Sequence, residues 1–411
     1  MKLCVVTAAH IDPATGNLVL NGRPVFPLGL SDPPPVGSKA PNGRDAWAEV
    51  ARAGVNFTRN YTVWTPGAAG EELIPVVEQL DAARDHDVHV WLALAGVDNN
   101  LSHAALLDQI VDAVKGHPGL GAWKGTDEPA HARVPAAGCV AVYKRVRSRD
   151  PDHPVVIIEA PRLPGPTRGS PDRPLTVAGV RPYAAACDIH GVDIYPVSRP
   201  PGRHAGGPPI NTDISVVGDL TRILAQATGR KALWTTLQIA WSGVLPPHPT
   251  VFPTLQQARF MAYDAVIAGA RGLFFFGGHL RQVMTDADAR RGWNWTYWRK
   301  VQRPLLEELS GEHHRAALLA PDAAHRVTAS AADIALSTRQ TSEFLYVIAA
   351  RRSPSATGRI RFTGLPVSVR SGTVLAHPGG NPARSVTVAG GAFTDPSPYQ
   401  PHNARVYRFA L

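Results

Sequence analysis

Cysteine is scarce in this sequence, and its three cysteines, Cys4, Cys139 and Cys187, are odd in number and far apart. This pattern argues against a disulfide framework and shows no zinc-ligand spacing. Long apolar runs are also missing, because no segment approaches the roughly 18 apolar residues that a membrane span needs. The opening MKLCVVTAAH turns polar too quickly for a signal peptide. We therefore expect no membrane partner, and a protein that is cytoplasmic, or secreted with its signal sequence absent from this chain.

A clustered charge pattern is absent as well. Lys and Arg number 42 against 33 Asp and Glu, which gives a net charge of +9, but the basic residues are scattered and no nucleic-acid-binding motif accompanies them. No G-x-G-x-x-G follows the first strand-like run, no His-x-His pair lies on it, and the histidines show no ligand spacing. The sequence therefore predicts no nucleic-acid partner, no cofactor and no metal, and it indicates no particular oligomeric state.

The sequence does contain a repeated alternation of short apolar runs with amphipathic stretches of helical period. Eight strand-like runs occur, at 24–31, 56–64, 88–96, 121–129, 154–161, 189–197, 232–241 and 271–278. Helical patterns lie between them, for example at 71–86, 103–116 and 254–270. Nearly continuous apolar strands joined by helices are typical of a parallel sheet covered on both faces. Eight such units predict an α/β fold of the (β/α)8 type, the TIM barrel.

Two flanking segments depart from this alternation. Residues 16–29, GNLVLNGRPVFPLG, predict a β-hairpin with Asn21 and Gly22 at its turn, placed as a lid on the barrel floor. From His325 onward, alternating segments separated by Gly, Pro and Ser predict a small antiparallel β-sandwich, with strands at 343–350, 358–364, 371–377, 384–391 and 404–411. We therefore expect a barrel domain over residues 1–320, hairpin included, and a C-terminal β-sandwich domain over 321–411.

Carboxylates end three of the predicted barrel strands, and active sites of such barrels lie at the C-terminal strand ends. The fourth strand ends in Asp127 and Glu128, the fifth in Glu159 and the sixth in Asp193. Pro129 marks the end of the fourth strand and is expected to hold Glu128 extended at the barrel mouth. A carboxyl half-sheltered by aromatic rings has a raised pKa and can stay protonated near neutrality, as a general acid must.

Aromatic and polar side chains at the same rim indicate a sugar ligand, because flat rings stack on the apolar faces of sugars. The predicted substrate contacts are Asp127, Glu159, Arg59, Asn60, Tyr61, Trp64, Tyr195, Gln238, Trp241, Trp293 and Trp295. Each has a structural alternative: an acid can pair with Arg59 or cap a loop, and a tryptophan can cover a helix end. Lys124 is expected to neutralise a carboxylate, with a Schiff-base role as the minor alternative. A Pro/Gly-rich loop at 198–213 is expected to close over the site.

Four segments together resemble the retaining glycoside hydrolases of clan A: VLNGRPVFPLG (19–29), GVNFTRNYTVW (54–64), GTDEP (125–129) and GVDIYPV (191–197). The resemblance is strongest to a glycosidase-like group with a D-E-P motif on strand four and a small C-terminal β-domain, and it covers nearly the whole chain through short motifs. It implies the acid/base role for Glu128, contact with the sugar 2-hydroxyl for Asp127, support of the nucleophile for Arg59, and the family's strand-six tyrosine position for Tyr195.

The chain departs from the family pattern on strand seven, where the nucleophilic glutamate would fall on Gln238. An amide cannot act as a carboxylate nucleophile. Either Asp193 first, or Glu159 second, partners Glu128 as nucleophile or as the base of an inverting mechanism, or Gln238 positions a substrate group that assists its own cleavage. The sequence therefore predicts a glycoside hydrolase acting on a poly- or oligosaccharide, with Glu128 and Asp193 as catalytic residues. A catalytically silent carbohydrate-binding barrel is the alternative.

Overall fold

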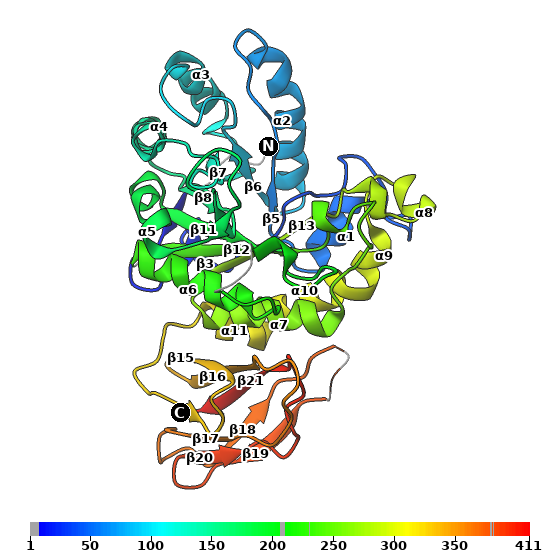
Figure 1. Ribbon diagram of the computed structural model, residues 1–411. Helices are drawn as coiled ribbons and strands as arrows, with labels where there is room; N and C mark the ends of the chain where they lie inside the picture. Colours follow the sequence, from blue (N-terminus) through cyan, green and yellow to red (C-terminus); the bar gives the residue numbers. More distant parts are fainter. Residues whose placement is uncertain (1–7, 206–209, 230, 379, 381) are drawn as a thin grey trace.

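The computed structural model describes residues 8–205, 210–229, 231–378, 380 and 382–411. Eight parallel strands form a closed barrel (Figure 1). In order around the barrel they are β4 (Leu28–Leu30), β5 (Phe57–Arg59), β6 (His89–Ala93), β7 (Leu120–Asp127), β8 (Val155–Glu159), β11 (Ile189–Asp193), β12 (Ala232–Gln238) and β13 (Gly272–Phe276). Each lies within or nearly within one of the eight predicted runs. The predicted (β/α)8 barrel is confirmed.

Helices cover the outside of the barrel and account for the continuous burial of its strands, since every residue of β8 and β12 is buried. The helices are α1 (Ala46–Arg52), α2 (Ala69–Asp85), α3 (Ala104–Val114), α4 (Ala136–Arg149), α5 (Val177–Val180), α6 (Val216–Thr228), α7 (Leu255–Ile267), α8 (Asp286–Ala289), α9 (Trp295–Tyr297), α10 (Arg303–Ser310) and α11 (Glu312–Leu319). No helix among the described residues combines the length and the apolar composition that crossing a bilayer requires.

The predicted N-terminal hairpin is confirmed and closes the floor of the barrel. Strands β2 (Leu18–Leu20) and β3 (Arg23–Val25) pair antiparallel, and β1 (Ala9–Ile11) adds a third strand. Asn21 and Gly22 both have positive φ, 50° and 77°, as a two-residue type I′ turn requires. Leu18 and Leu20 join the same buried apolar cluster as Trp91 and Trp234 of the barrel interior.

The C-terminal region forms two antiparallel sheets, which confirms the predicted β-sandwich. The larger sheet has the order β15 (Ile334–Gln340), β16 (Phe344–Arg351), β21 (Ala404–Ala410), β18 (Ser371–Val374) and β19 (Arg384–Thr387). The smaller sheet is β14 (Thr328–Ala329), β17 (Arg361–Thr363) and β20 (Ala392–Thr394). The sandwich lies below α7 and α11 in Figure 1. The domain boundary between residues 320 and 321 stays a prediction.

The cysteines are consistent with the expected lack of a disulfide framework. Cys139 and Cys187 are free and buried. Cys4 lies outside the described residues.

Candidate active site

Two of the predicted carboxyls meet at the C-terminal rim of the barrel. Glu128 directly follows β7, and Asp193 is the last residue of β11. Their side chains interact, and each carboxyl contributes to the pKa of the other. The Glu128 side chain keeps 35% of its surface exposed, whereas Oδ1 of Asp193 is buried. The fold thus presents a carboxyl pair whose outer member is partly exposed at the C-terminal rim.

The expected extended backbone at Glu128 is wrong. Its φ is +46°, in the left-handed region that residues other than glycine rarely adopt. The register between β7 and β8 shifts between Lys124 and Asp127, and a bulge of this kind re-aims the side chains that follow it. The Glu128 N–H then donates to the carbonyl of Ile158 at 2.8 Å, and its carbonyl accepts from the N–H of Ala132 at 2.9 Å. These two bonds hold the strained residue in place.

The carboxyl pair is arranged to retain a proton. Burial, and then the charge of Asp127, raise the pKa of Glu128. Burial, and then the charge of Glu128, raise the pKa of Asp193 well above its usual range. Two carboxyls in contact cannot both ionise without strong repulsion, so the pair titrates as a unit and keeps one proton to higher pH than a lone carboxyl would.

Asp127 lies beside this pair and has the opposite electrostatic setting. Its Oδ1 is 2.7 Å from Nζ of Lys124, and its Oδ2 is 3.2 Å from Nη2 of Arg59. Burial by itself raises the pKa of Asp127, but the two cations outweigh burial and hold that pKa well below its usual range. The side chain is nevertheless 51% exposed. Asp127 is therefore an ionised carboxylate within reach of a ligand, and the expected neutralising role of Lys124 is confirmed.

A second group of polar side chains lies at the ends of strands one, two and eight, namely β4, β5 and β13. The ring of Tyr61, 41% exposed, covers the Arg59 guanidinium at 3.9 Å. Burial raises the pKa of the Tyr61 hydroxyl, and the charge of Asp32 raises it further. Asp32 also lies 3.0 Å from Nδ1 of His279. Sequence reasoning missed Asp32, although it follows the first strand-like run directly and precedes Pro33, as Glu128 precedes Pro129.

Tyr195 backs the carboxyl pair from the β11 side. Burial, and then the charge of Asp193, raise the pKa of the Tyr195 hydroxyl, and the ring of Tyr195 stacks on Phe276 and on His204, with centroids 5.1 and 4.6 Å away. Nδ1 of His204 accepts the N–H of Tyr195 at 3.1 Å, and burial lowers the pKa of His204 to about 3, so this ring is neutral. His204 lies in the loop at 198–213, of which residues 206–209 lie outside the described residues.

Four predicted tryptophan contacts are packed inside the fold. They are Trp64, Trp241, Trp293 and Trp295, with 1, 7, 1 and 2% exposure. The Trp64 indole donates to the carbonyl of Ala93 at 2.7 Å, and the Trp293 indole donates to the carbonyl of Asp32 at 2.8 Å. Trp293 and Trp295 pack edge to face with each other, their ring centroids 4.9 Å apart. The structure thus places these rings in supporting positions behind the mouth.

Two further predicted substrate contacts, Asn60 and Glu159, direct their polar groups to partners within the protein. The Asn60 amide donates to Gln79 at 2.8 Å. Glu159, with no exposed surface, lies 3.1 Å from Nε2 of His190 and accepts the N–H of Ala130 at 3.2 Å. Neither side chain is presented to a ligand in this arrangement.

Gln238, at the strand-seven position, is 1% exposed and bound on both sides of its amide by Val197. Its Oε1 accepts the N–H of Val197 at 2.9 Å, and its Nε2 donates to the carbonyl of the same residue at 2.7 Å. The amide therefore fastens the end of β12 to the segment that follows β11.

Replacing Gln238 by Glu is therefore expected to lower the free energy of unfolding by about 3 kcal/mol and to leave no accessible nucleophile, because a buried carboxyl oxygen would face the carbonyl of Val197. Urea denaturation measures this loss. Gln282→Glu, at an exposed position, is the matched control and should leave stability unchanged. Equal stability of the two variants would contradict the structural role of the amide.

Among the described residues, no group of three or more His, Cys, Asp or Glu side chains is arranged to hold a metal ion. No protein-family model matches the sequence, and neither does any curated protein.

The fold itself is similar to solved structures of glycoside hydrolases. One, described as a glycoside hydrolase, has a TM-score of 0.64 at 12% identity, over 98% of this chain and 96% of that one. A family 5 glycoside hydrolase from Bacteroides vulgatus has a TM-score of 0.64 at 14% identity, over 98 and 92% of the two chains. A GH30 endoxylanase from Clostridium papyrosolvens has a TM-score of 0.53 at 11% identity, over 98 and 100%. The resemblance to clan A is confirmed for the fold.

Proposed function

We propose that this clan A-like barrel hydrolyses glycosidic bonds of a poly- or oligosaccharide, with Glu128 as the general acid. The observation that carries the proposal is the Glu128 carboxyl, which is partly exposed at the C-terminal rim of the barrel, lies beside Asp193 and is raised in pKa. A glycosidic oxygen needs a proton as its bond to the sugar breaks. A reachable carboxyl that stays protonated toward neutral pH supplies one.

Asp127 provides the complementary charge in this proposal. The sugar ring becomes positively charged in the transition state, and a fixed negative charge beside it lowers the activation free energy of bond cleavage. Lys124 and Arg59 keep Asp127 ionised, whereas burial and the charge of Asp127 raise the pKa of Glu128 next to it. Neighbouring carboxyls whose pKa values are pushed apart in this way are typical of an acid and its charge-stabilising partner.

Asp193 acts on the acid in this proposal. Catalytic carboxyls of retaining glycosidases lie roughly 5–5.5 Å apart, and those of inverting enzymes roughly 6.5–9.5 Å. The interaction between Glu128 and Asp193 shifts the pKa of both carboxyls, which favours a shared proton over a role for Asp193 as the second catalytic carboxyl. We infer that Asp193 shares and holds the proton that Glu128 delivers.

Replacing Asp193 by Asn is expected to move the alkaline limb of the kcat/KM profile to lower pH by about one unit or more. Activity requires the shared proton and falls as the pH rises through the raised pKa of the pair. Without Asp193 the pair no longer holds one proton between two carboxyls, and only the pKa of Glu128, raised by burial and by Asp127, sets the limb. Asp85→Asn, which removes an exposed carboxylate at the end of α2, is the control. An alkaline limb that stays in place in Asp193→Asn would refute the shared proton.

A second candidate function is carbohydrate binding without hydrolysis, and the amide of Gln238 at the strand-seven position favours it. A panel of polysaccharides separates the two functions. Release of reducing ends by the native protein that is lost in Glu128→Gln supports hydrolysis. Saturable binding of a polysaccharide without any release of reducing ends supports the silent barrel.

A further inference from the structure

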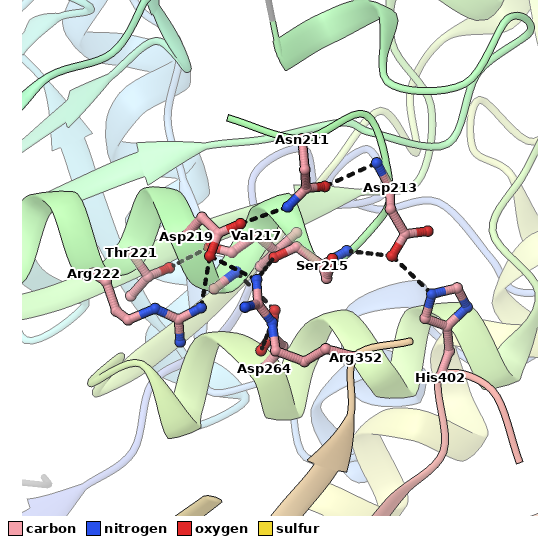
Figure 2. Close-up of polar contacts among 11 residues, drawn as sticks. Asn211, Asp213, Ser215, Val217, Asp219, Thr221, Arg222, Asp264, Arg352 and His402 are labelled. Atoms are coloured by element: carbon pink, nitrogen blue, oxygen red, sulfur yellow. Dashed lines mark hydrogen bonds and ion pairs between the residues drawn. The ribbon is translucent and has the colours of Figure 1, made fainter. Parts of the chain in front are cut away.

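Two side chains of the C-terminal sandwich reach the barrel at the start of α6 (Figure 2). Arg352 directly follows β16, and its Nη2 donates to Oδ1 of Asp219 at 2.6 Å and to the carbonyl of Ser215 at 2.7 Å. His402 lies in the turn before β21, and its Nε2 is 2.9 Å from Oδ2 of Asp213. Asp213, Ser215 and Asp219 belong to the segment that leads from β11 into α6 and to the first turns of α6.

These contacts form one connected network. Asp219 also accepts from Nη2 of Arg222 at 2.8 Å and from the amide of Asn211. Nε of Arg352 lies 3.5 Å from Oδ1 of Asp264 on α7, a carboxylate with no exposed surface. Isolated surface ion pairs contribute little, but a linked and partly buried set fixes the geometry of the groups that it joins. The network therefore holds the end of the β11–α6 segment against the sandwich.

The beginning of the same segment carries the predicted catalytic machinery. Its two halves touch, since a Cβ atom built on Gly202 would lie 2.5 Å from Cα of Thr212. The N–H of Gly202 also donates to the carbonyl of Pro196 at 3.2 Å. Thr212 directly precedes Asp213, which His402 binds. Close packing thus connects the part of the segment that the sandwich holds to the part beside the rim.

The last link runs through side chains already described. His204 stacks on Tyr195, which lies two residues after Asp193, the last residue of β11. Asp193 in turn interacts with the carboxyl of Glu128. A displacement of the segment at Asp213 would therefore move the residues that place the carboxyl pair.

We propose that Arg352 and His402 are positioning residues for the reaction: by fixing the end of the β11–α6 segment, they set Tyr195 and Asp193 against Glu128. The kinetic part of this inference rests on the proposed hydrolase function. A network that only attaches the sandwich to the barrel would affect stability but neither the rim segment nor the titration of Glu128.

The test is the double variant Arg352→Gln/His402→Gln, with Arg351→Gln as the matched control. Arg351 is the neighbouring arginine, and its guanidinium pairs with Asp333 inside the sandwich at 2.7 Å. Hydrogen–deuterium exchange of the backbone amides of residues 194–204 is the first readout. We expect faster exchange there in the double variant but not in Arg351→Gln, at a temperature where both remain folded.

The second readout is the titration of the Glu128 carboxyl, followed by ¹³C NMR and assigned through Glu128→Gln. We expect the midpoint to shift in the double variant but not in Arg351→Gln, because the interaction with Asp193 contributes to the pKa of Glu128. The other charged groups that face Glu128, namely Asp127, Lys124 and His131, are unchanged by these substitutions. If the double variant does not fold, His402→Gln alone provides both readouts with a smaller effect.

Kinetics complete the test. We expect kcat to fall about ten- to a hundredfold in the double variant, since displacement of a catalytic group by an ångström has effects of this size. KM should change much less, because Arg59 and Tyr61 are untouched. Native-like exchange and native-like Glu128 titration in the double variant would overturn the positioning role. A native protein that releases no sugar would instead overturn the proposed function, while the first two readouts would still decide this inference.

Discussion

Glu128→Gln is expected to lower kcat/KM for a cleaved polysaccharide by about 10²- to 10⁴-fold, which is the usual contribution of a positioned general acid. The amide keeps the size of the side chain and can still bond to Asp193, but it has no proton of suitable acidity to give to the leaving oxygen. Reducing-end release, measured at the pH optimum of the native protein, gives the ratio.

Measurements of substrate affinity and of thermal stability distinguish a loss of catalysis from a loss of binding or of folding. The affinity for the same polysaccharide, measured by calorimetry, should stay close to that of the native protein, and so should the melting temperature. Glu78→Gln, an exposed position on α2, is the matched control and should keep full activity. Full activity of Glu128→Gln would remove Glu128 from the role of acid.

Asp127→Asn is expected to have two large effects. Loss of the fixed negative charge should reduce kcat by about 10²-fold or more. It should also lower the free energy of unfolding by about 2 to 3 kcal/mol near neutral pH, because Lys124, 1% exposed, loses its nearest counter-charge. This figure is below that for a fully enclosed pair, since solvent screens the half-exposed Asp127.

The pH dependence of this stability loss has a defined sign. Burial already lowers the pKa of Lys124, and removal of Asp127 should lower it further. The unfolded chain then binds the lysine proton more tightly than the folded one, so stability rises with pH. The stability deficit of Asp127→Asn should therefore shrink as the pH is raised toward 10, the usual range for lysine. Urea denaturation at several pH values measures it.

A compensating variant separates the two effects of Asp127. Asp127→Asn/Lys124→Met removes both charges, so it should recover most of the lost stability while activity stays low. Recovery of activity along with stability would show that Asp127 acts only as a partner of Lys124.

The barrel was predictable from sequence because its strands are buried on both faces and therefore appear as apolar runs. The convergence of Glu128 and Asp193 followed from the same fact, since parallel strands bring their ends to one rim. The bulge at the end of β7 left no local trace in the sequence, and it set Glu128 in the left-handed region against the usual effect of Pro129. Local rules fail where tertiary hydrogen bonds fix the backbone.

The tryptophans show the limit of reading a loop from its neighbours. Trp293 and Trp295 stand among polar and charged residues, which suggested exposure. In the structure they pack against each other and against the nearby Trp298. Asp32 was missed although the strand-end argument could have found it, because it directly follows the first strand-like run. Strand β15 escaped recognition because its exposed and buried positions do not alternate regularly.

The seam where β13 pairs with β4 joins the first barrel strand to the last, with Leu28 opposite Leu273. A chain emerging from the ribosome therefore carries β4 with one bare edge until the eighth strand has been made. Unpaired strand edges invite association with other chains, and contacts between distant parts of a sequence form slowly. Nascent or truncated forms that lack β13 should consequently depend on chaperones in a way that the finished protein does not.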